Sequence, residues 1–198
     1  MRTLNLMFWL AAGAVSVTAA GSAFADDSKA PAGDMKAMDA QTDEQIVASA
    51  MRAAPEKVGQ AATVIAMNAD GSMRTVREGS NGFTCMADNP ETPGPDSMCM
   101  DKNAMEWVQA YMAHKPPPEG KIGLMYMLEG GTDASNTDPY ATNPDASNHW
   151  ITTGPHFMIV GADQAFYDAY PKSADPDTSA PYIMWPGTPY QHLMAPVK

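Results

Sequence analysis

The sequence is poor in basic residues and in cysteine. Its 198 residues include 12 Lys and Arg against 23 Asp and Glu, which gives a formal net charge of −11, and only two cysteines. A general nucleic-acid-binding protein presents a basic surface to the phosphates, and electrostatic attachment to anionic lipid needs the same kind of surface. We therefore expect neither nucleic acid nor an anionic membrane surface among its partners.

The sequence also lacks the short motifs of several common enzyme classes. It contains no GxGxxG dinucleotide fingerprint, no P-loop, no HExxH or GxSxG motif and no zinc-finger spacing of cysteine and histidine. With 44% hydrophobic and 18% charged residues, the composition is that of a folded globular chain, and the length fits one domain. These features favour a binding protein over an enzyme and leave the substrate or ligand open.

The chain has only one long apolar stretch, at its start. Arg2 precedes an uncharged segment over residues 3–20, which ends in the small-x-small pattern of Ala23 and Ala25. This arrangement predicts a signal peptide over residues 1–25, cleaved after Ala25, and hence a periplasmic or secreted protein. A transmembrane helix is the alternative, but a glycine, a serine and a threonine dilute the second half of the segment. No membrane attachment is expected after cleavage.

The stretch after the expected cleavage point cannot bury an apolar face. Residues 26–41 are rich in Asp, Ala, Lys, Pro and Gly, and methionine is their only large apolar residue. We expect them to form a flexible acidic leader. One folded domain then occupies residues 42–198.

Export changes the interpretation of the two cysteines. In an oxidising compartment, Cys85 and Cys99 alone in a domain are most simply a disulfide, closing a loop that is rich in proline. A thiolate metal site is the alternative, because Met86, Met98 and Met100 lie beside the cysteines.

Apolar periodicity predicts an α+β fold, with a mainly antiparallel sheet, a few flanking helices and long polar loops. The connections are of hairpin length, and strands and helices do not alternate as in a parallel βαβ fold. Helices are expected over residues 43–54, 101–114 and 163–170. Strands are expected over residues 62–67, 73–77, 83–86, 122–128, 156–160, 182–185 and 190–197.

A polar segment over residues 132–153 interrupts this pattern. A loop of this length in a compact domain is usually functional, or it hides a short element. The tetrapeptide Asp-Ala-Ser-Asn occurs in it twice, beginning at Asp133 and at Asp145. Two turns stabilised by Asp and Asn side chains explain the repetition, and an oxygen-rich cation loop that uses Asp133, Asp138 and Asp145 is the alternative.

Methionine is unusually frequent, with 17 residues in the chain. Methionine is a flexible gap-filler of hydrophobic cores, and its thioether is also a soft ligand that suits Cu(I). Two segments share the pattern His-x-Met, namely His156-Phe157-Met158 and His192-Leu193-Met194. Residues two apart in a strand point to the same face, so the two segments could bring His156, Met158, His192 and Met194 to one copper ion if their strands are neighbours. Packing of the methionines in the core is the simpler explanation.

Three functions follow from these residues. The first is a binding module for a soft metal of the copper type, or for a small ligand, in the C-terminal half. The second is a metal-assisted hydrolase that uses His149 and His156 with Asp133 or Asp138 and keeps one coordination position open. The third is a domain that interacts with the cell envelope and has no small-molecule site. Aromatic residues of the C-terminal half could line a pocket or a partner groove: Tyr140, Trp150, Tyr182, Trp185 and Tyr190.

Several short segments are distinctive as a set. They are EGSNGFTCM at 78–86, AHKPPP at 113–118, DASNTDPY at 133–140, TGPH at 153–156 and GTPYQHLM at 187–194. Together they resemble a family of exported bacterial proteins without an assigned activity, over residues 58–198. The resemblance implies a single secreted domain and supplies no catalytic, cofactor or binding residue.

Overall fold

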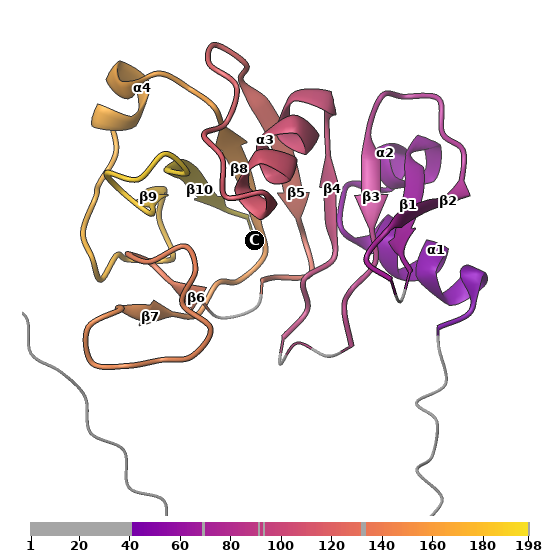
Figure 1. Cartoon of the computed structure of the whole chain (residues 1–198), viewed down its shortest axis with the longest axis horizontal. Coiled ribbons are helices and arrows are strands. Elements are labelled where there is room, and N and C mark those ends of the chain that lie inside the picture. Colours follow the sequence, from indigo (N-terminus) through magenta and orange to yellow (C-terminus); the bar gives the residue numbers. More distant parts are fainter. Residues whose placement is uncertain (1–40, 69, 91, 93, 132–133, 198) are drawn as a thin grey trace, which may run out of the picture. The chain divides into compact units, whose positions relative to one another are not determined.

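A large β-sheet forms the centre of the protein in this computed structural model (Figure 1). The structure describes residues 41–198 except 69, 91, 93, 132, 133 and 198, so the expected signal peptide and nearly all of the expected leader lie outside the described residues. Within the described part of the chain, the sheet has eight strands, in the order β2 (Met73–Arg77), β1 (Thr63–Met67), β3 (Thr84–Met86), β4 (Met98–Met100), β5 (Gly123–Met127), β8 (His156–Val160), β10 (His192–Pro196) and β9 (Tyr182–Met184). Neighbouring strands are antiparallel except β1 and β3, which are parallel.

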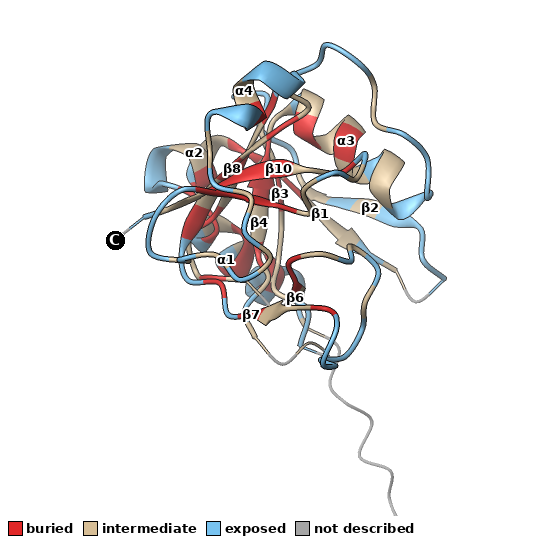
Figure 2. Ribbon diagram, turned by 90° about the vertical axis from the view of Figure 1, so that its left-hand side faces the viewer, coloured by how far each residue is buried: buried red, intermediate tan, exposed pale blue. Residues whose placement is uncertain are grey.

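Short helices cover both faces of this sheet. The described helices are α1 (Asp43–Arg52), α2 (Glu56–Ala61), α3 (Lys102–Met112) and α4 (Gln164–Asp168). α3 packs over β4 and β5 on one face, whereas α1 packs against β1 and β3 on the other face. Buried residues concentrate on the central strands and on the inward sides of the helices (Figure 2). The domain is therefore rich in sheet with a mostly antiparallel arrangement, which confirms the coarse prediction, although the sheet dominates more than expected.

Local sequence signals explain where the two longest helices begin. The side chain of Thr42 accepts a hydrogen bond from the backbone N–H of Gln45, and the Gln45 side chain accepts one from the backbone N–H of Thr42. This reciprocal capping box satisfies two backbone donors that the helix leaves unpaired. Asp101 caps α3 through the N–H of Ala104, and its second carboxylate oxygen accepts from the N–H of Leu124 at 3.1 Å. One carboxylate thus caps α3 and also holds it against β5.

Four short elements were not expected from the sequence: α2, β4, β6 and β7. Pro55 was expected only to end the first helix, but it also stands at the N-cap position of α2, where a proline fits because the first helical N–H groups need no partner within the helix. β4 is too short to show a periodicity, and it forms by pairing with β3 and β5. The polar segment over residues 132–153 holds a small second sheet of β6 (Ala134–Ser135) and β7 (Trp150–Ile151).

The cysteines lie within disulfide distance of each other. Cys85 on β3 and Cys99 on β4 are direct cross-strand partners with Cα atoms 4.0 Å apart, and both are completely buried. The described residues contain no free cysteine. The predicted pairing is confirmed, and it joins two strands at the middle of the sheet.

A buried asparagine connects the polar segment to the rest of the domain. The Asn136 backbone N–H donates to the carbonyl of His149, and its carbonyl accepts from the N–H of Trp185. Its side-chain amide donates to the carbonyls of Ser173 and Ala174, at 2.9 and 3.1 Å. Asn136 is fully buried, so these bonds are shielded from water and link three loops.

Among the described residues, no helix has both the length and the apolar composition needed to cross a membrane.

Candidate functional site

The two His-x-Met segments lie on neighbouring strands. His156 and Met158 belong to β8, His192 and Met194 belong to β10, and Met158 stands directly opposite Met194 in the antiparallel pair. Cross-strand partners share one face of a sheet, as do residues two apart on one strand. All four side chains therefore lie on the same face, and none of them is more than 7% exposed.

The strand register separates the two imidazoles. His156 stands opposite Pro196, and His192 stands opposite Val160, at the other end of the same strand pair. Four residues along a strand correspond to about 13 Å. The His192 ring lies edge-on to Trp107 and Trp185, with ring centroids 5.5 and 4.9 Å apart. The structure thus places the four predicted ligands on one face of neighbouring strands, but the two histidines stand at opposite ends of the strand pair and do not meet at one ion, because the antiparallel register offsets them by four residues.

His156 lines a small hollow together with Met194. The hollow has a volume of about 10 Å³, and its remaining walls come from Pro196, Tyr182, Thr178 and the backbone turn at 153–154. This is about the space that one water molecule or one ion occupies. A histidine and a methionine from different His-x-Met segments therefore line the same small hollow.

A glycine allows the neighbouring loop to approach the His156 ring. A Cβ atom at Gly131 would lie 3.2 Å from Cε1 of His156 and 2.4 Å from Oγ1 of Thr153. A larger residue at position 131 would require the Thr153 side chain to turn away and would press against the imidazole, so glycine lets the loop cover the ring closely.

Both histidines are held in the same tautomer. Nδ1 of His156 lies 2.7 Å from the carbonyl of Gly154, and Nδ1 of His192 lies 2.9 Å from the carbonyl of Tyr190. A carbonyl can only accept, so each Nδ1 carries the proton and each Nε2 keeps its lone pair. Burial lowers the pKa of His156, and burial lowers the pKa of His192 to about 4, against the opposing effect of the carbonyl contacts. Both rings are therefore neutral at pH 7 and have the form that binds a metal through Nε2.

The face that holds these histidines is rich in methionine. Among the described residues, six strands contribute eight methionines to this face and its margins: Met86, Met98, Met100, Met125, Met127, Met158, Met184 and Met194. Met127 stands directly opposite His156, and Met184 stands directly opposite His192. Each histidine therefore has a methionine as one of its two direct cross-strand partners, in addition to the methionine two residues along its own strand.

The alternative metal residues that the structure describes make other contacts. Asp133 lies outside the described residues. Oδ1 of Asp138 accepts from the backbone N–H of Tyr140, and Oδ1 of Asp175 lies 2.9 Å from Nδ1 of His149. Within the described part of the chain, no group of three or more His, Cys, Asp or Glu side chains is arranged to hold a metal. The geometry gives the hydrolase hypothesis no open coordination site there.

In the polar segment over residues 132–153, the two described aspartates Asp138 and Asp145 stabilise turns. Oδ1 of Asp145 accepts from both the backbone N–H and the hydroxyl of Ser147, each at 2.7 Å, and these bonds lower the pKa of Asp145. The Asp138 carboxylate bonds two residues along the chain in the same way. Turns stabilised by aspartate side chains account for both positions.

The sequence pointed to four ligand residues but missed the methionines supplied by other strands. Met127 and Met184 follow no local motif with histidine, because their proximity depends on which strands pair. The only available signal was the high frequency of methionine itself. Comparisons with protein-family models, curated proteins and solved structures find no match for this chain.

Proposed function

We propose that the protein is an exported binding module for a soft monovalent metal ion of the Cu(I) type, with His156 and Met194 as its central ligands. The observation that carries the proposal is the single-ion hollow between these two side chains, one of which offers an unprotonated Nε2. Imidazole and thioether are the ligands that Cu(I) selects over the oxygen donors preferred by Mg²⁺ and Ca²⁺. Met158 and Met127, which neighbour Met194 and His156, are the further thioethers within the same face.

Export is part of the proposal and has separate support. The cysteine pair at disulfide distance fits an oxidising compartment, and the start of the sequence has the form of a signal peptide. A buried site with neutral ligands also suits binding rather than catalysis, because nothing in it is arranged to activate water. The core-packing role of the methionines remains compatible with metal binding, since a thioether can serve both purposes.

The test is a Cu(I) titration of residues 26–198 under anaerobic conditions, with a chromophoric Cu(I) chelator as competitor and Ag(I) as a second probe that has no redox chemistry. We expect one ion bound with a dissociation constant of micromolar or tighter. His156→Asn and Met194→Leu should each weaken binding by about tenfold or more, the range that a lost contact at a metal site typically produces.

Met100→Leu is the matched control. Met100 is fully buried on the same face but stands opposite Met125 and does not line the hollow. Circular dichroism and thermal unfolding check that each variant is folded. Absence of micromolar binding, or equal binding by the control and by both folded site variants, would overturn the proposal.

A further inference from the structure

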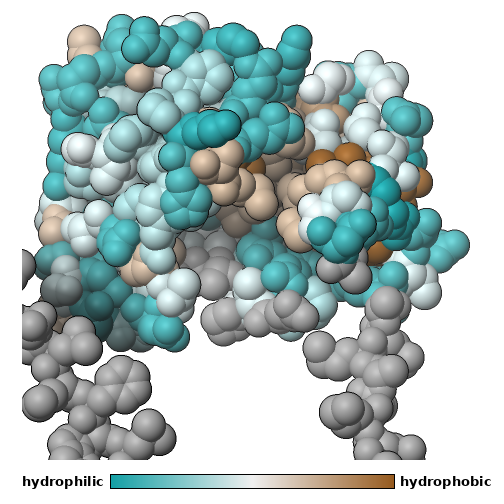
Figure 3. Space-filling view, in the orientation of Figure 1, coloured by the Kyte–Doolittle hydropathy of each residue, from teal (hydrophilic) through white to brown (hydrophobic). Residues whose placement is uncertain are grey.

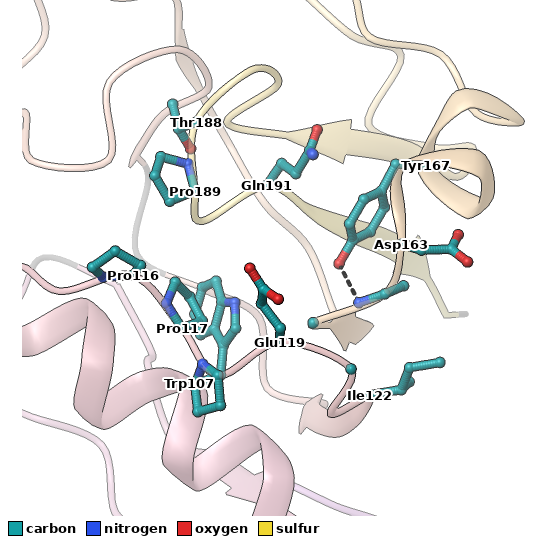
Figure 4. A pocket seen from close by; sticks show the side chains of 14 residues that line it. Trp107, Pro116, Pro117, Glu119, Ile122, Asp163, Tyr167, Thr188, Pro189 and Gln191 are labelled. Carbon is teal, nitrogen blue, oxygen red and sulfur yellow. Dashed lines mark hydrogen bonds between the residues drawn. The ribbon is translucent and has the colours of Figure 1, made fainter.

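A second cavity lies at the opposite end of β8 from the hollow at His156. It is a cleft of about 510 Å³ between the proline segment 116–118, the turn 161–163 after β8 and the segment 188–191 before β10 (Figure 4). Its volume lies within the range of small-molecule sites. Trp107, Pro116, Pro117 and Ile122 form apolar walls, and the side chains shown in Figure 4 surround an open centre.

The walls of the cleft are fixed by backbone contacts. Gly161 has a φ of +69°, and a Cβ atom there would lie 2.2 Å from the carbonyl oxygen of Lys121, so only glycine lets these two segments meet. At the other end, the Tyr190 hydroxyl donates to the carbonyl of Lys115 at 3.1 Å. These contacts hold the proline segment in place beside the turn after β8, and the cleft is formed before any ligand binds.

The charged side chains that line the cleft are all acidic. Its charged lining residues are Glu119 and Asp163, and no Lys, Arg or His is among the described residues that line it. One carboxylate oxygen of Asp163 caps α4 by accepting from the N–H of Phe166 at 2.8 Å. In Figure 4 the Glu119 carboxylate points into the open centre of the cleft, whereas the Asp163 carboxylate points away from it. Of the lysines near the cleft in sequence, Lys121 pairs with Glu106 and Lys172 pairs with Asp168, whereas Lys115, next to Pro116, forms no ion pair among the described residues.

A hydroxyl group adds a further polar contact. The Tyr167 oxygen accepts from the N–H of Ala162 at 3.0 Å, the bond drawn in Figure 4, and burial raises the pKa of this phenol. The group therefore stays neutral at pH 7 and adds no positive charge to the cleft. The face in Figure 3 is also mostly hydrophilic, with apolar residues gathered near its middle, as expected for a chain with a net charge of −11.

We propose that this cleft binds a small organic cation, a protonated amine or a guanidinium group carried on an apolar body. The apolar part would lie against the proline wall, Ile122 and the edge of Trp107, and the cationic head would lie near Glu119. A carboxylate in a cleft with low-dielectric walls concentrates cations there. An anionic ligand would meet repulsion from this carboxylate. This proposal is independent of metal binding at His156.

The experiment compares benzylamine, benzyl alcohol and benzoate, which share a ring and carry positive, zero and negative charge. Binding is followed on ¹⁵N-labelled residues 26–198 through the indole N–H of Trp107 and the amides of Gly120 and Gly161. We expect benzylamine to bind at these signals about fivefold more tightly than benzyl alcohol, the effect of one partly exposed ion pair, and benzoate to bind more weakly than either. The preference for benzylamine should shrink as salt is added.

Glu119→Gln and Glu78→Gln are the matched variants. Both glutamates are exposed, but Glu78 lies after β2 and does not line the cleft. Glu119→Gln should weaken benzylamine binding by about fivefold and leave benzyl alcohol unchanged, whereas Glu78→Gln should change neither. Equal binding of the amine and the alcohol, or an equal effect of the two variants, would overturn the proposal, as would the absence of shifts at the cleft signals. None of these results would bear on the Cu(I) titration, which reports on the other site.

Discussion

Met127 on β5 and His156 on β8 are direct cross-strand partners on the buried face of the sheet. Their positions in the chain are far apart, and only the antiparallel pairing of these two strands brings them together. The same face gives His192 a methionine partner, Met184 on β9. The neighbours of each histidine are therefore decided by strand order more than by the His-x-Met pattern in which it occurs.

The burial of His192 makes the stability of the protein depend on pH. Its pKa is about 4 in the folded state, against an ordinary value of 6.5, so the unfolded chain binds the proton more readily between these two pH values. The free energy of unfolding should therefore be highest, as far as this group is concerned, above pH 6.5. It should fall by up to about 3 kcal/mol as the pH drops toward 4. Urea unfolding of wild type and His192→Asn at pH 7 and pH 5 measures the difference.

His114→Asn is the control for that measurement. His114 is exposed and has a φ of +53°, a conformation that asparagine tolerates. The control should keep the wild-type loss of stability between pH 7 and pH 5, and His192→Asn should lose a large part of it. An unchanged pH dependence in His192→Asn would contradict the buried, neutral state of this ring.

Gly161 should be far less tolerant of substitution than Gly187. Both have a positive φ, +69° and +79°, but a Cβ atom at Gly161 would meet the Lys121 carbonyl at 2.2 Å, whereas no atom lies within 4 Å of one at Gly187. Gly187→Ala should lower the free energy of unfolding by about 1 kcal/mol through backbone strain alone. Gly161→Ala should cost about 2 kcal/mol more, because the chain must also move. Equal losses in chemical unfolding would show that the close approach to Lys121 is absent.

The disulfide between Cys85 and Cys99 should stabilise the protein by lowering the conformational entropy of the unfolded chain. The cysteines are 14 residues apart in sequence, and a closed loop of this size is worth about 3 kcal/mol in the chain-entropy model. Replacing both with alanine should lower the free energy of unfolding by about that amount. A reducing agent should destabilise the wild type and leave the double variant unchanged, and an equal response of the two proteins would argue against the bond.

The stability of the protein should depend on a hydrogen-bond donor in the side chain of residue 136. Its amide donates to the carbonyls of Ser173 and Ala174 in a fully buried position. Asn136→Ala should destabilise the protein by about 2 kcal/mol through loss of these bonds. Asn136→Asp should cost more at pH 7, because a carboxylate would face two carbonyl oxygens, and its penalty should shrink at lower pH as the carboxyl group is protonated. Thermal unfolding at two pH values distinguishes the variants, and an aspartate variant as stable as wild type would contradict this role.

Much of the local structure could be predicted from short patterns. The capping box at Thr42 predicted the start of α1, and the apolar spacing within residues 101–114 predicted α3, because both depend on residues within a few positions of each other. The alternating or continuous apolar runs predicted β5, β8 and β10. β4, β6 and β7 span only two or three residues, too few to show a period. β4 forms by pairing with β3 and β5, and β6 and β7 form by pairing with each other.

The candidate site also depends partly on the sequence alone and partly on the tertiary structure. The amino-acid sequence determined the chemistry, namely an excess of thioethers, four histidines, two cysteines and few cations, because composition alone decides which ligands a chain can offer. It also determined that His156 and Met158 share a face, since the side chains of a strand alternate. Which histidine meets which methionine, and that His156 and Met194 border the same single-ion hollow, depended on the order and register of strands distant in the chain. The hydrogen bonds and buried contacts between those strands set that register, and no local pattern encodes them.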